Sequence, residues 1–121
     1  MRKGRKITGG RYKHSRKKRK YELPSPQRIV KINKTRRKEM RKMGGKRKTV
    51  LLACEEANII DKKGKAKSVK IKNVIETSAN RFWARQNILV KGAIIETELG
   101  KARITNRPGQ EGCINAVLIE R

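Results

Sequence analysis

The sequence is poor in the residues that build active sites, disulfide scaffolds and membrane spans. It has 2 cysteines and 1 histidine, and aromatic residues make up 3% of its 121 positions. Cys54 and Cys113 are too few for a disulfide framework or a CxxC zinc site, so we expect two reduced, mostly buried thiols and no metal. No uninterrupted apolar run exceeds five residues, which excludes a membrane-spanning helix. The first residues lack the apolar region of a secretory signal, so we expect an intracellular protein.

Acidic residues are also scarce. The chain has 35 Lys and Arg against 10 Asp and Glu, a net charge of +25. Residues 1–48 contain 22 basic and 2 acidic residues but only 10 of the apolar ones, whereas residues 49–121 contain 13 basic, 8 acidic and 32 apolar residues. Such a positive charge requires a polyanion as partner. Nucleic acid is favoured over a membrane, because residues 1–20 lack the bulky apolar face of a membrane-binding helix.

Residues 1–28, the basic N-terminal segment, mix cations with Gly, Ser and Pro and show no helical or strand-like apolar period. We predict that this segment is an extended tail, disordered alone and ordered on a nucleic acid, where glycines let the backbone approach phosphates. A solubilising or nuclear-import tail is the alternative. His14 is interpreted as a phosphate or base contact, because no fixed pocket surrounds it there.

Residues 29–121 are predicted to form an all-β domain, a small barrel or sandwich of about six or seven short strands. Within it, residues 29–48 are expected to be extended or a basic hairpin, in which Gly44-Gly45 joins about 36–43 to 47–54, although a short helix over 34–43 also fits. Strands are expected at 50–54, 58–60, 68–74, 88–90, 93–97, 101–105 and 114–119.

The pattern of polar residues gives no support to an enzyme. No two carboxylates have an evident reason to converge, and the Gly44-Gly45-Lys46 step lacks both the first glycine and the Ser or Thr of a phosphate loop. We therefore expect no catalytic residue, no cofactor and no small-molecule substrate.

The aromatic cluster Phe82-Trp83 lies between two arginines, Arg81 and Arg85. We interpret the two aromatic side chains as filling one end of the barrel, with base stacking as the alternative. The arginines are expected to face RNA in either case. Arg103 and Arg107, near the Arg107-Pro108-Gly109 loop, are either surface charges or a second contact patch.

Several segments together resemble one family of ribosomal proteins. They are Arg5 to Gly10, Arg16 to Leu23, Arg41 to Gly45, Val90 to Thr97, Gly100 to Thr105 and Arg107 to Gln110. These segments are similar to the eukaryotic-type small-subunit ribosomal protein eight family, which archaea and eukaryotes share and which is unrelated to bacterial protein eight. The short length resembles an archaeal member. The resemblance implies a β-barrel-like domain on small-subunit ribosomal RNA, next to other ribosomal proteins, in cytoplasmic ribosomes. It also implies that residues 1–28 are a basic RNA-penetrating extension, which passes between RNA helices.

We therefore predict a structural component of the small ribosomal subunit that neutralises RNA phosphates with its tail and docks its β domain on the RNA. A biogenesis factor acting transiently on pre-ribosomal RNA and a chromatin-like DNA binder are the rival interpretations. The candidate RNA contacts are Arg2, Lys3, Arg5, Lys6, Thr8, Gly9, Gly10, Arg11, Tyr12, Lys13, His14, Arg16, Lys17, Lys18, Arg19, Lys20, Arg28, Arg36, Arg37, Arg41, Lys46, Arg47, Lys48, Arg81, Arg85, Arg103 and Arg107.

Overall fold

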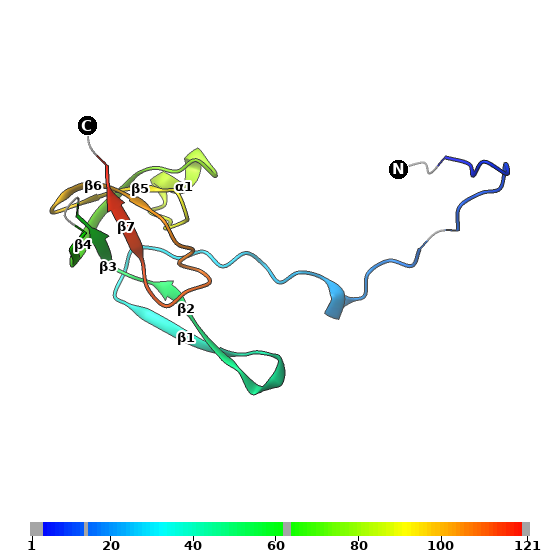
Figure 1. Cartoon of the computed structure of the whole chain (residues 1–121), viewed down its shortest axis with the longest axis horizontal. Coiled ribbons are helices and arrows are strands. Elements are labelled where there is room, and N and C mark those ends of the chain that lie inside the picture. The colour runs from blue at the N-terminus through cyan, green and yellow to red at the C-terminus, as the bar shows by residue number, and fades with distance from the viewer. Residues whose placement is uncertain (1–3, 14, 62–63, 120–121) are drawn as a thin grey trace.

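The structure is a computed structural model that describes residues 4–13, 15–61 and 64–119 (Figure 1). In these residues strands dominate, which confirms the all-β prediction. The strands are β1 (Arg36–Arg41), β2 (Arg47–Ala53), β3 (Glu56–Ile60), β4 (Ala66–Glu76), β5 (Ile94–Thr97), β6 (Gly100–Ile104) and β7 (Asn115–Leu118). The helical elements are α1 (Arg81–Arg85) and two 3₁₀ turns, η1 (Lys20–Glu22) and η2 (Met43–Gly45).

The five strands β3 to β7 form a closed barrel in which each strand pairs with the next one in sequence. These pairs are antiparallel, and the barrel closes where β7 lies parallel to β3, with Asn58 opposite Asn115 and Ile60 opposite Val117. Closure pairs both edges of the sheet, which would otherwise expose unpaired backbone groups. Of the two predicted architectures, barrel and sandwich, the barrel is the one that forms.

The barrel interior follows from the alternation of side chains along its strands. In β3, Ala57 and Ile59 are buried, whereas their neighbours in the strand are exposed. Isoleucines provide the bulk of the core, and the buried alanines, such as Ala102 and Ala116, keep the narrow interior from being overfilled.

A separate antiparallel hairpin, β1 with β2, extends from the barrel in Figure 1. It confirms the predicted hairpin, and the alternative helix over 34–43 does not form. Gly44 and Gly45 turn the chain with φ of 69° and 73°, a left-handed conformation that disfavours other residues. All six residues of β1 are exposed, whereas Val50 and Leu51 of β2 are fully buried, so the hairpin is anchored through its second strand.

The predicted strand at residues 88–90 is wrong. Ile88 and Leu89 are both 1% exposed, and burial of consecutive side chains is incompatible with one face of a barrel strand. The segment pairs instead with residues 30–32: the Leu89 amide donates to the Val30 carbonyl at 2.8 Å, and the Ile32 amide donates to the Asn87 carbonyl at 3.3 Å.

The predicted packing of Phe82 inside the barrel is also wrong. Phe82 is 55% exposed and Trp83 is half-buried, because residues 81–85 form the helix α1 on the surface. The Asn80 side chain caps this helix by accepting from the Phe82 amide at 2.9 Å. The contact of α1 with the core comes from Ala84, a smaller side chain than the one expected there.

The two thiols are free. Cys54 is buried, as predicted, and its Sγ lies 3.1 Å from the Glu56 carbonyl, whereas Cys113 is half-buried. Across the described residues, no helix is long and apolar enough to cross a membrane. The same residues contain no group of three or more His, Cys, Asp or Glu placed to hold a metal ion.

Candidate nucleic-acid interface

The described residues of the basic N-terminal segment expose nearly all their side chains. Residues 5–11 form a tight turn, in which the Lys6 amide donates to the Gly10 carbonyl and the Gly9 amide to the Lys6 carbonyl, both at 2.9 Å. The Arg5 guanidinium donates to the Gly9 carbonyl at 3.1 Å, and the Lys6 ammonium lies 5.8 Å from the centre of the Tyr12 ring. The turn thus carries cations on both of its arms.

A second local structure is centred on Glu22. Its carboxylate accepts two hydrogen bonds from Arg16, at 2.8 and 2.6 Å, and one from the Arg19 amide at 2.9 Å. The bonds from Arg16, and then the one from Arg19, hold the pKa of Glu22 below its usual value, and the same pairing raises the pKa of Arg16. This contact orders the chain beside the run Lys17-Lys18, whose side chains stay exposed.

The hairpin is the second cationic surface. Residues 36–53 contain eight Lys and Arg and one acidic residue, Glu39. Arg41 lies directly opposite Arg47 in the register, and Glu39 pairs with Arg47 at 3.2 Å on the exposed surface. Like charges opposite one another destabilise a strand pair. The hairpin therefore carries more positive charge than its own carboxylate offsets, and a bound anion would relieve the repulsion.

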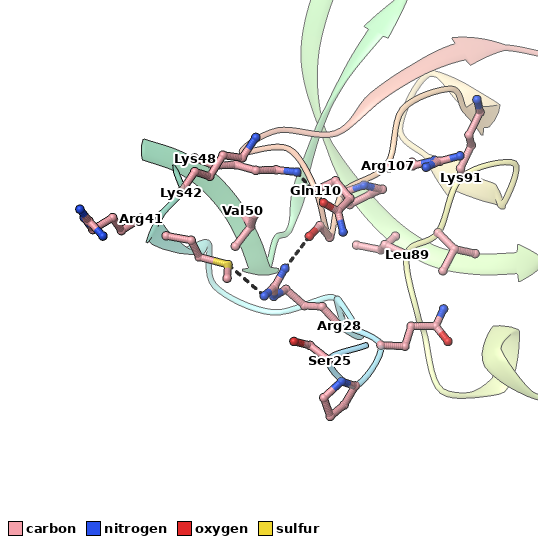
Figure 2. Close-up of a pocket in the computed structure, with 16 residues that line it drawn as sticks. Ser25, Arg28, Arg41, Lys42, Lys48, Val50, Leu89, Lys91, Arg107 and Gln110 are labelled. Carbon is pink, nitrogen blue, oxygen red and sulfur yellow. Dashed lines mark hydrogen bonds between the residues drawn. The ribbon is translucent and has the colours of Figure 1, made fainter. Parts of the chain in front are cut away.

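A groove of about 550 Å³ separates the hairpin from the barrel, and we call it the basic groove (Figure 2). Four segments distant in sequence line it: 25–28, 40–42 with 48 and 50, 89–91, and 107–110. Six cations are among the lining residues and no Asp or Glu is, in the described part of the chain. The cations are Arg28, Arg41, Lys42, Lys48, Lys91 and Arg107.

Arg28 lies in the middle of the basic groove (Figure 2). Its guanidinium donates to the Gly109 carbonyl at 2.9 Å and reaches the Met40 sulfur at 3.0 Å. A Cβ on Gly109 would lie 3.2 Å from the Arg28 carbonyl, so glycine permits the close approach of the two segments. On the rim, Lys48 donates to the Gln110 side-chain oxygen, and the Arg41 side chain extends away from the groove in Figure 2.

A third basic site lies on α1. Arg81 and Arg85 are exposed, and together with Phe82 they line a hollow of about 300 Å³. The Arg81 guanidinium lies 5.2 Å from the centre of the Phe82 ring. An exposed ring between arginines is the arrangement that stacks on an unpaired base.

The structure thus groups most of the predicted contacts into four places: residues 5–13, the 16–20 run, the hairpin with the basic groove, and α1. It separates Arg103 from Arg107: Arg107 lines the basic groove, whereas Arg103 lines another hollow with Glu76 and Ser78. Arg2, Lys3 and His14 lie outside the described residues. The sequence-based candidates did not include Lys42 and Lys91, because nothing in the sequence distinguishes them from the other cations. Only the fold shows that both line the basic groove.

Comparison with known proteins gives a consistent family signal. The family model described as ribosomal protein S8e matches residues 1–119. The small ribosomal subunit protein eS8 of Methanocorpusculum labreanum is 53% identical over 117 residues, 96% of this chain and 94% of that protein. Proteins of the same name from Methanosarcina barkeri and Sulfolobus acidocaldarius are 47% and 52% identical, covering 96% and 95% of this chain and 94% and 91% of their own lengths.

Proposed function

This chain belongs to the ribosomal protein S8e family, as a protein of the small ribosomal subunit and not an enzyme, and from this membership we propose that it stabilises small-subunit RNA by phosphate neutralisation. The basic N-terminal segment follows the RNA backbone between closely packed helices. The hairpin and the barrel supply a rigid surface that fixes the register of the contact. Neighbouring ribosomal proteins in a cytoplasmic ribosome complete the proposed surroundings.

The observation that carries this proposal is the placement of charge on the hairpin. β1 is exposed along its whole length, and Arg41 lies opposite Arg47 at the far end from the buried Val50 and Leu51. A hairpin selected for stability alone would place opposite charges there. RNA phosphates supply the missing negative charge.

The α1 site adds a different kind of contact. Phe82 is more than half exposed, and a protein surface gains little stability from such a ring. Stacked on an unpaired base, an aromatic ring contributes about 1 to 3 kcal/mol. Arg81 and Arg85 line the same hollow as the ring, and in this proposal they contact the adjoining phosphates. We propose that α1 stacks on one unpaired base, while the basic segment binds without regard to sequence.

The test of the proposal is quantitative mass spectrometry of this protein across a sucrose gradient of cell lysate, followed by a high-salt wash of the small-subunit fraction. Stoichiometric retention in mature small subunits is the expected result. Recovery confined to precursor particles would favour a transient biogenesis factor, and preferential recovery with DNA would favour the chromatin-like interpretation.

A separate binding assay addresses the mechanism. If six to ten phosphates are neutralised, affinity for an rRNA transcript falls by about 10³ to 10⁵ between 50 and 200 mM salt. Binding that is insensitive to salt would contradict phosphate neutralisation even in a protein that stays on the ribosome.

A further inference from the structure

The basic groove has two features that phosphate neutralisation alone does not require. Its lining offers apolar surface to a ligand, since Pro26 is exposed and the Met40 side chain is 37% exposed. It is also a recess of about 550 Å³ rather than a flat surface, within the range of sites that enclose small molecules. An exposed strand such as β1 can bind a row of phosphates without any recess. The recess therefore indicates a ligand with an apolar part.

The rim has the opposite character. Arg28, Lys91 and Arg107 approach the recess from three different segments of the chain. In the described part of the chain none of the six groove cations makes an ion pair, because the two ion pairs there are Arg16–Glu22 and Arg47–Glu39. A ligand with negative charge on its outer side would form ion pairs with these cations.

Polar uncharged groups complete the lining. Ser25, Gln27 and Gln110 contribute hydroxyl and amide groups that both donate and accept hydrogen bonds. Such groups match the edge of a nucleobase, which also alternates donors and acceptors. The apolar side chains, the amide groups and the cations of the groove thus match the three parts of a nucleotide: its ring face, its base edge and its flanking phosphates.

We propose that the basic groove binds one unstacked nucleotide of a bulge or loop in RNA. The base lies on Pro26 and Met40, its edge faces the glutamines, and its flanking phosphates lie on Arg28 and Arg107. A paired nucleotide cannot enter, because its base is stacked within the duplex. This inference rests on the proposed RNA-binding function and adds to it a recognition site for unpaired nucleotides.

Arg28 is the pre-positioned part of this site. It is half-buried, and its bond to the Gly109 carbonyl fixes the guanidinium between the hairpin and the 107–110 loop before any ligand arrives. A side chain that is already ordered loses less freedom on binding than a mobile surface cation does. Arg28 thus distinguishes the groove from the exposed run at residues 16–20.

The experiment compares two RNA hairpins that differ by one bulged 2-aminopurine nucleotide. They are bound at equal salt to the full chain carrying Phe82→Ala, which removes the base stacking proposed for α1. We expect the bulged RNA to bind about tenfold more tightly than the fully paired one, with the 2-aminopurine fluorescence changing on binding. The double variant Lys91→Gln/Arg107→Gln should bind both RNAs with nearly equal affinity. The matched control Lys70→Gln/Lys72→Gln, which removes two exposed charges from β4, should keep the tenfold ratio.

The ratio of the two RNA affinities distinguishes the groove proposal from the proposed RNA-binding function. If both RNAs bind in a salt-dependent way with equal affinity, or if the groove variant keeps the preference, the groove proposal is overturned and the proposed function stands. If neither RNA binds, the proposed function itself fails. Circular dichroism of the variants shows that the strands are intact in each case.

Discussion

Removal of residues 1–23 is the most direct test of how much the cations of the basic N-terminal segment contribute to RNA binding. The cut leaves Arg28 and the buried Val30 in place, so the contact with Gly109 and the core are retained. We expect a folded β domain whose binding to RNA is far less sensitive to salt.

The magnitude follows from the described cations. The removed stretch contains nine described Lys and Arg, of which Arg16 is paired with Glu22, leaving eight. At one phosphate each, they contribute about 6 to 7 to the slope of log Kd against log salt. Between 50 and 200 mM salt, the full chain should therefore lose about 10³ to 10⁴ more affinity than the truncated chain does.

The assay is a fluorescence titration of a small-subunit rRNA transcript at four salt concentrations. A variant with Lys17, Lys18, Arg19 and Lys20 changed to Gln should lower the slope by about 3. Its matched control changes Lys65, Lys67, Lys70 and Lys72 of the barrel side and should lower it much less. Equal slopes for the full and truncated chains would refute the reasoning, and loss of the strand signal in the truncated chain would show that the segment is needed for folding.

Three further predictions concern single residues. Phe82→Ala should leave the thermal unfolding midpoint nearly unchanged, because the ring is 55% exposed, yet weaken RNA binding by about 1 to 3 kcal/mol in a filter-binding assay. Since pairing with Arg16 lowers the pKa of Glu22, their contact should persist above the usual carboxyl value and be lost as pH falls through the lowered pKa; an NMR titration should show this transition, and Glu22→Gln should abolish it. Gly45→Val should destabilise the chain by about 1 to 2 kcal/mol, because φ there is 73°, whereas Gly4→Val, with nothing within 4 Å, should not change the unfolding midpoint.

The parts of the fold that the sequence predicts correctly are those fixed by neighbours in the chain. The Gly44-Gly45 pair marks the hairpin because few other residues adopt two successive positive φ angles. Alternation in residues 101–105 marks β6 because side chains of a strand alternate between core and solvent. Local chemistry is sufficient in both cases.

The wrong predictions arise where contacts between segments that are distant in sequence determine the local structure. Ile88 and Leu89 look like a barrel strand, but the backbone there bonds to residues 30–32 instead, and both side chains are buried. Phe82 looks like a core residue, yet the Asn80 cap starts a helix that turns the ring outward. The basic groove joins Arg28 to Gly109 across 81 positions, and no pattern within one segment predicts such a contact.

The parallel pairing of β3 with β7 has a consequence for the order in which the chain can acquire its structure. β7 follows every other strand in sequence, so the ring of strands stays open during synthesis until residues 115–118 have been added. The cations of residues 1–48 and the β1–β2 pairing are local and precede that step. A growing chain therefore exposes the residues that we propose to bind RNA while the edges of β3 are still unpaired, an interval in which early contact with RNA would protect it from aggregation.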